Sequence, residues 1–356
     1  MTVSVCIIGS GFGMYGLLPA FSEISNCKVL SICGKNSERM SNFCKKFNVK
    51  QYNDWKEMLY KERPDAIAVA VIPKHQFEII KFALENNIAV FAEKPLTTSY
   101  KTSLELCKIA VEKKLPNMIN FMFPEIPEWK TLKKLIENKK IGKISNIDVT
   151  WTFLSYDLKN HIKTWKTDVT EGGGALSLFF SHGFHYLEYF LGSIINLQCT
   201  LNSSKLSLNK GETGIEMSVT FENGCKGNIH VNISNSENPT HILEFHGTDG
   251  KLILKNITSK IVDDFELYLH NSNKQEKIDS SHFSVCFPSG DFDPRVKYVS
   301  ALAWRFIQWC DTKSFSPTIT VKPDFQDGLR VQELIDTART SVGTVLVLPI
   351  DLDTKT

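Results

Sequence analysis

The first third of the chain alternates short apolar runs with longer segments of helical periodicity. The apolar runs are residues 3–9, 28–34, 66–73 and 88–95, and the helical segments between them are residues 13–24, 37–48 and 75–87. Near-continuous apolar strands are typical of sheets buried on both faces, and their alternation with helices is typical of βαβ units. The pattern therefore predicts an α/β domain over residues 1–120, with a parallel sheet covered by helices.

The pattern changes near residue 120, where the strands become longer and alternate apolar with polar positions. These strands are residues 144–154, 215–224, 225–234 and 241–256. Asn223-Gly224 and Asp249-Gly250 predict tight turns, because both dipeptides favour short hairpin loops. Such strands and turns are typical of an antiparallel sheet.

Helices flank this second set of strands. One is expected at residues 128–139, an apolar one at residues 174–192, and a last one at residues 328–343. We therefore predict a second domain, residues 121–356, of the α+β class with a large, mostly antiparallel open sheet. Its last helix is expected to pack back toward the first domain.

The bulk properties exclude several classes of protein. The 356 residues carry a net charge of +2 with both signs interspersed, so the chain lacks the basic footprint of a nucleic-acid-binding protein. The nine cysteines are scattered without a CxxC pair, which indicates free thiols in a reducing compartment and no zinc site. The N-terminus lacks signal-peptide features and no run of about 18 apolar residues occurs, so we expect a cytoplasmic protein without a membrane partner.

A glycine-rich turn, GSGFGMYG, joins the first apolar run to the first helix. There Gly9 allows a tight turn, Gly11 lets the backbone approach a pyrophosphate, and the helix N-terminus supplies free N–H groups. Met14 stands where a third glycine is usual, so we expect this helix to pack slightly farther from the sheet. The motif predicts a Rossmann dinucleotide-binding domain; an ordinary strand–helix turn is the alternative. The residues expected to contact the cofactor are Gly9, Ser10, Gly11, Phe12 and Gly13.

The second apolar run bears on the choice of dinucleotide. NAD-binding versions usually end this strand with an acidic residue that bonds the ribose 2′-OH, but here no acid occurs between Glu23 and Glu38. Gly34 leaves room for a 2′-phosphate and Lys35 supplies a cation, so we predict NADP(H) in preference to NAD(H). The alternative is that Lys35 is a solvated turn residue. Supporting hydrogen bonds are expected from Asn36, Ser37 and Arg39.

The segment VFAEKPLTTS, with Glu93-Lys94-Pro95, is a more specific signal. Together with EGGGALS at residues 171–177, FHGTDGKLIL and DGLRVQELIDTARTS, it resembles the glucose–fructose oxidoreductase / inositol dehydrogenase / rhizopine catabolism (Gfo/Idh/MocA) oxidoreductase family over nearly the whole chain. The resemblance implies an NAD(P)-dependent oxidoreductase of sugars, nucleotide-sugars or polyols. It also implies that Lys94 lies in the active site before a cis peptide, where its ammonium stabilises charge on the substrate oxygen. Ile72, Pro73, Glu93 and Lys94 are expected beside the cofactor.

Two histidines lie three positions apart in SHGFHYLEYFLG. Many family members carry D-x-x-x-H here, and counting from Gly174 places the acid/base histidine at His182, with His185 as a substrate-binding candidate. The aspartate position is Leu178, so no carboxylate precedes His182 by one turn. A substrate-binding or core histidine is the alternative for His182. A metal site is disfavoured, because no third ligand is evident and helical histidine ligands favour i, i+4 spacing.

Further substrate-binding candidates follow by position. The family often contacts substrate near Asn120, where its usual arginine is missing, and Trp165 and Lys166 could bind a sugar ring and an anionic group. A homodimer or homotetramer through the C-terminal sheet is implied by the resemblance.

Two classes of function fit these residues. The preferred one is a sugar or nucleotide-sugar dehydrogenase or reductase, with His182 moving the hydroxyl proton and Lys94 stabilising the oxygen within about 3 Å. The other is a cofactor-binding regulator or scaffold without turnover, motivated by Leu178. A redox-cycling epimerase or aldose–ketose oxidoreductase is a third possibility among enzymes.

Overall fold

The computed structural model describes residues 2–209, 211–235, 238–271, 274–283, 290–311, 321–341 and 346–347. The chain forms two compact units, Met1–Glu125 with Val285–Gln332, and Ile126–Ser284 with Glu333–Thr356. Among the described residues, eight cysteines are present as free thiols, whereas Cys286 lies outside the described residues. No helix in the described ranges is long and apolar enough to cross a membrane.

The first unit is built on a parallel sheet with the strand order β3-β2-β1-β4-β5-β6. The strands are β1 (Val3–Ile8), β2 (Cys27–Cys33), β3 (Lys50–Tyr52), β4 (Ala66–Val69), β5 (Ala89–Ala92) and β6 (Asn117–Ile119). The helices are η1 (Gly13–Leu17), α1 (Leu18–Ser22), α2 (Glu38–Phe47), α3 (Trp55–Glu62), α4 (Pro73–Glu85), α5 (Tyr100–Glu112), η2 (Phe123–Glu125) and α9 (Val296–Cys310). This doubly wound order confirms the predicted α/β fold and places its switch point between β1 and β4.

The third and fourth apolar runs form the inner strands β4 and β5. Every residue of these two strands is buried, as expected for a sheet covered on both faces. β4 is shorter than the predicted residues 66–73, since it ends at Val69 and Pro73 begins α4. Proline at the first helical position has no N–H to lose and a fixed φ suited to the helix. The hydrophobic pattern missed β3, α3 and α5, which the structure shows between the predicted elements.

Helix α9 comes from late in the chain but belongs to the first unit. Its Phe306 packs edge-on against Phe21 and Phe91, with ring centroids 6.3 and 5.8 Å apart. All three rings are fully buried. This packing places the N-terminus of α9, at Arg295, within the first unit.

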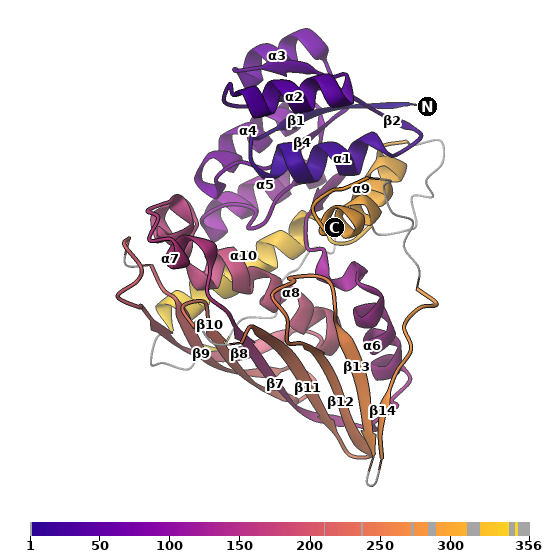
Figure 1. The fold of residues 1–356 in the computed structure, drawn as a ribbon, viewed down its shortest axis with the longest axis vertical. Helices are drawn as coiled ribbons and strands as arrows, with labels where there is room; N and C mark the ends of the chain where they lie inside the picture. The colour runs from indigo at the N-terminus through magenta and orange to yellow at the C-terminus, as the bar shows by residue number, and fades with distance from the viewer. Residues whose placement is uncertain are drawn as a thin grey trace. The chain divides into compact units, whose positions relative to one another are not determined.

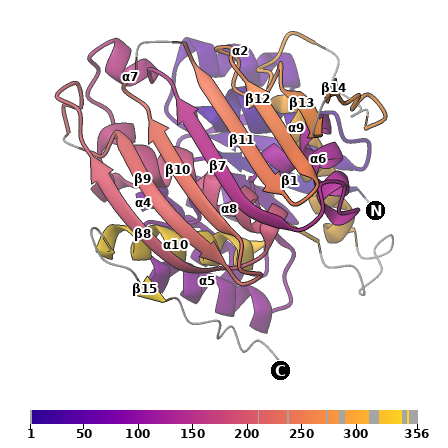
Figure 2. The same cartoon turned by 90° about the horizontal axis from the view of Figure 1, so that it is seen from below.

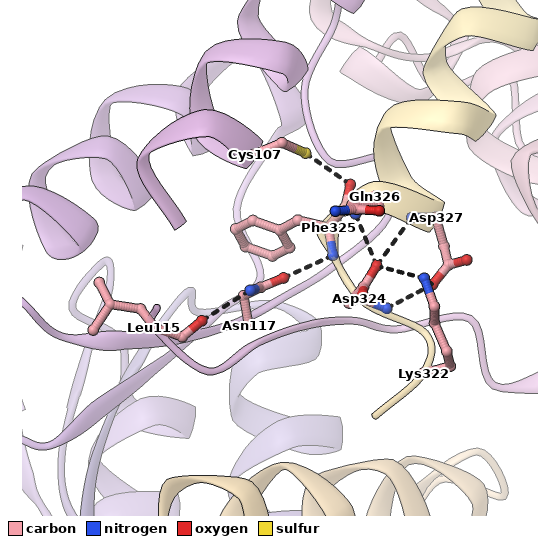
Figure 3. Close-up of polar contacts among 8 residues, drawn as sticks. All are labelled: Cys107, Leu115, Asn117, Lys322, Asp324, Phe325, Gln326 and Asp327. Atoms are coloured by element: carbon pink, nitrogen blue, oxygen red, sulfur yellow. Dashed lines mark hydrogen bonds and ion pairs between the residues drawn. The ribbon is translucent and has the colours of Figure 1, made fainter. Parts of the chain in front are cut away.

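Helix α10 (Phe325–Thr340) begins in the first unit with a capped first turn, drawn in Figure 3. The Asp324 carboxylate accepts hydrogen bonds from the backbone N–H groups of Gln326 (2.9 Å) and Asp327 (3.2 Å). Asp327 in turn accepts from the Asp324 N–H at 2.7 Å, which makes a reciprocal capping arrangement. The Phe325 N–H donates to the Asn117 side chain at 2.8 Å, so the helix start is fastened to β6. The predicted helix ran to residue 343, of which residues 342–343 lie outside the described residues.

The second unit is built on a sheet in which nine strands of the described chain take the order β14-β13-β12-β11-β7-β10-β9-β8-β15. The strands are β7 (Ile144–Thr152), β8 (Ile194–Asn202), β9 (Gly214–Phe221), β10 (Lys226–Asn232), β11 (Thr240–Gly247), β12 (Gly250–Asn256), β13 (Glu266–Asn271), β14 (Lys274–Lys277) and β15 (Leu346–Val347). Neighbouring strands are antiparallel except β7 and β10, which are parallel. The mostly antiparallel sheet is confirmed, and the predicted turns at Gly224 and Gly250 join β9 to β10 and β11 to β12.

Helices α6 and α8 lie on one face of this sheet, as Figures 1 and 2 show from two directions. The helices of the second unit are α6 (Pro127–Glu137), α7 (Tyr156–Lys159), η3 (Trp165–Thr167), η4 (Val169–Glu171), η5 (Ala175–Phe179) and α8 (Phe180–Leu191). The predicted helix at residues 174–192 thus begins as a π-type turn before continuing as α8.

An aromatic cluster fills the space between these helices and the sheet. The His241 ring stacks on Trp151 at 4.3 Å between centroids, and its Nε2 lies 3.3 Å from the Tyr186 hydroxyl. Trp129 packs edge-on against Tyr186 at 5.0 Å. Complete burial lowers the pKa of His241 to about 3, so this histidine is neutral in the folded protein near neutral pH.

Candidate active site

The glycine turn follows β1 at the switch point of the parallel sheet. Gly9 has a φ of +135°, and a Cβ there would lie 2.2 Å from the Ala70 carbonyl oxygen. Only glycine therefore fits between β1 and the chain leaving β4. A Cβ on Gly11, in contrast, would meet nothing within 4 Å, so open space lies beside the exposed backbone at this position.

Helix η1 begins directly after the turn. Met14, in the position of the usual third glycine, is buried within the π-type turn Gly13–Leu17. Gly13 faces the sheet, where a Cβ would make an ordinary van der Waals contact with Ile7 at 3.4 Å. Gly16 is needed, because a Cβ there would lie 2.5 Å from the Phe12 ring. The Phe12 ring therefore lies back along the first turns of the helix.

The open backbone at Gly11 and the N-terminus of η1 fit the pyrophosphate of a dinucleotide. The helix start offers backbone N–H groups and a partial positive charge. A side chain at Gly11 would fill the space that a phosphate needs for close approach. The expected contacts by Ser10, Phe12 and Gly13 lie along the same turn, and they stay predictions.

The end of β2 contacts the glycine turn. A Cβ on Gly34 would lie 2.7 Å from the Ser10 Cβ, so the closeness of the turn alone requires glycine here. Lys35 is exposed and follows Gly34 directly. The missing side chain at residue 34 therefore does not by itself indicate a 2′-phosphate.

The polar residues after Gly34 already have structural partners. Ser37 caps α2 by accepting a hydrogen bond from the Met40 N–H at 3.1 Å. Asn36 accepts a hydrogen bond from Gln51. The Arg39 guanidinium lies 5.7 Å from the centre of the Tyr15 ring. Lys35 and Arg39 are the two cationic residues of the segment 34–39.

The ends of β4 and β5 complete the same edge of the sheet. Ile72 is the N-cap residue of α4 and Pro73 its first residue. The Lys94–Pro95 peptide after β5 is cis, as the family resemblance implies. The Gln76 amide donates to the carbonyl oxygens of Glu93 (3.0 Å) and Pro95 (2.8 Å), so α4 holds the backbone on both sides of Lys94.

Glu93 and Lys94 are only partly exposed, and their surroundings desolvate both charges. Desolvation lowers the pKa of Lys94 to about 8; the Arg295 guanidinium acts in the same direction and Glu93 opposes it. Burial raises the pKa of Glu93, whereas Lys94 and a 2.5 Å hydrogen bond from the Asn120 amide favour its ionised form. Lys94 is therefore a cation at neutral pH that can lose its proton close to physiological pH.

Asn120 follows β6 and is 3 % exposed. Its contact with Glu93 assigns it a place beside Lys94, and the buried residues Phe121, Met122 and Phe123 follow it. Asp293 and Arg295, which were not predicted from the sequence, approach the same region from the start of α9. The available signal was an Asp-Pro-Arg segment directly before a strongly amphipathic helix.

In the second unit, His182 lies on α8 and is 7 % exposed, while His185 is half-buried one turn further on. Leu178, in the usual aspartate position, lies in the π-type turn before α8. The Glu188 carboxylate accepts a hydrogen bond from the Ile194 N–H at 2.8 Å, so it caps the chain after α8.

The EGGGALS segment is fixed by residues from two other parts of the second unit. Gly174 has a φ of +90°, and a Cβ there would lie 2.3 Å from the Glu212 carboxylate. Arg339 donates to Glu212 and to the Ser177 hydroxyl, both at 2.9 Å. The EGGGALS and DTARTS signatures therefore meet in space and hold the start of the helix that carries His182.

The predicted sugar-binding residues Trp165 and Lys166 lie in η3, just before these glycines. A Cβ on Gly173 would lie 2.2 Å from the Trp165 carbonyl oxygen, so the two segments are closely packed. The Lys166 ammonium lies 3.3 Å from the buried Asp157 carboxylate. This ion pair gives Lys166 a structural partner that its position in the sequence did not predict.

No group of three or more His, Cys, Asp or Glu side chains within the described ranges could hold a metal ion. The edge of the first unit combines an open glycine turn with a desolvated lysine. A cation of this kind stabilises negative charge on a substrate oxygen.

Comparison with known proteins agrees with this reading of the two units. A family model described as an oxidoreductase family with an NAD-binding Rossmann fold matches residues 3–121, and a GFO/IDH/MocA C-terminal domain matches residues 129–253. An uncharacterised oxidoreductase of Synechocystis sp. is 24 % identical over 94 % of this chain and 92 % of its own length. A dTDP-3,4-didehydro-2,6-dideoxy-alpha-D-glucose 3-reductase of Actinomadura kijaniata is 29 % identical over 49 % of this chain and 52 % of its own length.

Solved structures share the fold over the full length. Levoglucosan dehydrogenase in complex with NADH and L-sorbose superposes with a TM-score of 0.82 at 17 % identity, covering 98 % of this chain and 99 % of that one. The WlbA dehydrogenase of Bordetella pertussis, in complex with NADH and UDP-GlcNAcA, gives a TM-score of 0.80 at 15 % identity, covering 99 % and 100 %. The two family models together span most of the chain, and the protein belongs to the GFO/IDH/MocA family of oxidoreductases, with an NAD-binding Rossmann domain.

Proposed function

We propose that the protein is a dehydrogenase or reductase that interconverts a secondary alcohol and a ketone on a sugar, nucleotide-sugar or polyol. The observation that carries this proposal is the desolvated Lys94 at the edge of the sheet that also bears the glycine turn. The relatives support the substrate class, because a dTDP-sugar reductase and levoglucosan dehydrogenase are among them.

Lys94 stabilises the substrate oxygen. In the alcohol-to-ketone direction this oxygen becomes alkoxide-like, and an ammonium in a desolvated site stabilises that charge more strongly than it would in water. A pKa of about 8 keeps the lysine protonated at neutral pH. Asn120 and Gln76 act indirectly by fixing Glu93 and the backbone around Lys94.

His182 is the proposed acid/base. It takes the hydroxyl proton during oxidation and returns it during reduction. Its place on α8 is set by the Arg339–Glu212–Ser177 contacts described above. The proposed substrate-binding residues of the second unit are His185, Trp165 and Lys166. Lys166 would bind substrate while it remains paired with Asp157.

The dinucleotide, when bound, supplies the hydride acceptor or donor. Residues 9–13 would hold its pyrophosphate, and Ile72, Pro73 and Glu93 would contact the rest of the dinucleotide. We propose NADP(H) in preference to NAD(H), because the exposed Lys35 and Arg39 offer cations and the strand end carries no acid. The two structural neighbours named above are complexes with NADH, so the proposed preference for NADP(H) rests on the residues of this chain alone.

A homodimer or homotetramer through the outer face of the nine-stranded sheet is part of the proposal. The face not covered by α6 and α8 carries a hollow lined mainly by polar residues of β7 to β10, including Asp148, Thr200, Glu216, Ser218 and His230. Such a mixed polar face suits pairing with a second copy of the chain.

The test is turnover with a panel of sugars, followed by the cofactor absorbance at 340 nm. Lys94→Met is expected to lower kcat by about 100- to 1,000-fold and His182→Asn by about 100-fold or more. The control is Lys81→Met, which removes a surface lysine paired with Glu105. Activity of Lys94→Met within a few-fold of wild type would overturn the assigned role of Lys94.

A cofactor-binding regulator without turnover is the second candidate, and Leu178 in the usual aspartate position favours it. For that function, dinucleotide binding would persist while no sugar was oxidised or reduced. An epimerase or aldose–ketose oxidoreductase that keeps its cofactor bound is a third candidate. It would convert substrate with no net change at 340 nm.

A further inference from the structure

Arg295 reaches the glycine turn from far along the chain. It is the N-cap residue of α9, whose packing through Phe306 fastens it to the first unit. Just before it, the Phe292 ring lies 6.2 Å from the Phe47 ring of α2 and 4.9 Å from the Lys46 ammonium. The described segment 290–295 is therefore packed against the nucleotide-binding unit at both ends.

Asp293 holds the Arg295 guanidinium in one orientation. The carboxylate accepts from Nε at 2.8 Å and from one terminal nitrogen at 2.7 Å, and it also accepts from the Arg295 backbone N–H at 3.0 Å. A bidentate pair of this kind is both strong and directional. It uses one edge of the guanidinium, which carries five N–H groups in all.

The guanidinium lies over the ring of Phe12, a residue of the glycine turn. Its central carbon is 4.6 Å from the centre of the Phe12 ring and 5.9 Å from that of Tyr15. Phe12 directly follows Gly11, where an added Cβ would meet nothing within 4 Å. The guanidinium thus lies over the residue that follows the candidate pyrophosphate position.

Arg295 lies among other charged side chains. Lys94 is close enough for the two cations to disfavour each other, and Arg295 also acts on Glu93. Burial lowers the pKa of Arg295, but Asp293 and Tyr15 raise it by more than burial lowers it. The guanidinium therefore stays protonated. Asp293 and Glu93 are carboxylates that oppose these two cations, and a bound pyrophosphate would stabilise both cations further.

We propose that Arg295 is a dinucleotide-binding residue, which contacts the cofactor pyrophosphate beside the glycine turn while Asp293 positions its guanidinium. The proposal rests on the dinucleotide-binding part of the proposed function and is independent of turnover. Arg295 lies outside the first 120 residues, which contain all the predicted nucleotide-binding motifs. It would therefore bring a cation to the glycine turn from a distant part of the sequence.

The experiment measures dissociation constants by calorimetry for NADPH, NADH, ADP-ribose and adenosine 2′-monophosphate, the last of which lacks a pyrophosphate. Arg295→Gln is expected to weaken ADP-ribose binding by about tenfold or more. It should change the binding of adenosine 2′-monophosphate by less than about twofold. Arg295→Lys keeps the charge without the planar fork, so an intermediate loss is expected.

The matched control is Arg305→Gln, the same change on the same helix, where the arginine pairs with Glu125 instead. It should leave all four constants unchanged. Should Arg295→Gln fail to fold, Asp293→Asn provides the second variant, with a selective loss of ADP-ribose affinity expected.

Unchanged ADP-ribose affinity in Arg295→Gln would overturn the proposal while leaving the dinucleotide site intact. An equal loss for both probes would also overturn it, because that pattern indicates a general disturbance of the turn through Phe12. Failure of the wild-type protein to bind any dinucleotide would reject this proposal and the proposed function together. Binding by wild type without turnover would reject only the enzymatic function.

Discussion

At the scale of single residues, desolvation moves the pKa values of Lys94 and His241 far from their usual ranges. Lys94 has its pKa lowered to about 8 at the candidate site, and His241 has its pKa lowered to about 3 in the aromatic core. The shifts have the same cause but different consequences. Lys94 remains charged at neutral pH and can act on a substrate, whereas His241 is neutral and serves packing against Trp151.

Lys94 predicts an alkaline limit to activity. The protonated lysine is the active form, so kcat/KM should fall as pH rises through about 8. Lys94→Arg should move this decline above about pH 10 at a lower maximum rate, because arginine stays charged. The measurement is the pH profile of both proteins with one substrate. An alkaline limb at the same pH in Lys94→Arg would assign it to another group.

His241 predicts a loss of stability in acid. The unfolded chain binds a proton near pH 6.5 but the folded protein does so only near 3, so stability falls as pH decreases through this window. Between pH 7 and 5 the expected loss is about 2 kcal/mol. The free energy of unfolding in urea should lose this part of its pH dependence in His241→Phe. The control variant His161→Asn, at an exposed site, should retain it. An identical pH dependence in His241→Phe would contradict the assignment.

At the scale of elements, the glycine positions separate folding from ligand binding. Gly9 is required by the close approach of Ala70, and Gly174 by the Glu212 carboxylate. Gly11 has no such neighbour, so its lack of a side chain has no structural reason in the described chain. An open position in a turn of this kind is explained by a ligand that approaches the backbone.

This contrast predicts opposite outcomes for two alanine substitutions. Gly9→Ala should destabilise the fold by about 2 kcal/mol or more, because the Cβ meets a carbonyl oxygen in a backbone conformation disfavoured for alanine. Gly11→Ala should leave stability within about 0.5 kcal/mol and weaken dinucleotide binding by about tenfold. Thermal unfolding and calorimetric titration check both. Unaltered dinucleotide affinity in Gly11→Ala would remove the turn from the cofactor site.

At the scale of the whole molecule, the α/β unit and the antiparallel sheet could be predicted because local apolar patterns repeat over many residues. Contiguous motifs such as the glycine turn and Glu93-Lys94-Pro95 were equally visible. The pairing of Lys166 with Asp157, the packing reason for Gly34 and the approach of Arg295 to Phe12 were not. Each depends on contacts between segments that no local pattern connects.

The proposed oligomer belongs to this scale. Ser218→Arg places a bulky charge in the hollow on the outer face of the sheet, so the protein should become monomeric while keeping its fold. Light scattering after size-exclusion chromatography measures the mass of both proteins. A wild-type mass of about 40 kDa, that of one chain, would contradict the proposed association.

The central claim is that hydride passes between a sugar carbon and the dinucleotide. The most direct measurement uses sugars deuterated at their secondary carbons, with mass spectrometry of the cofactor recovered from wild-type protein and from Lys94→Met. The account predicts deuterium in the wild-type cofactor with at least one sugar of the panel, and little or none in Lys94→Met. A cofactor that binds the wild-type protein but gains no deuterium from any of these sugars would contradict the account and favour a regulator.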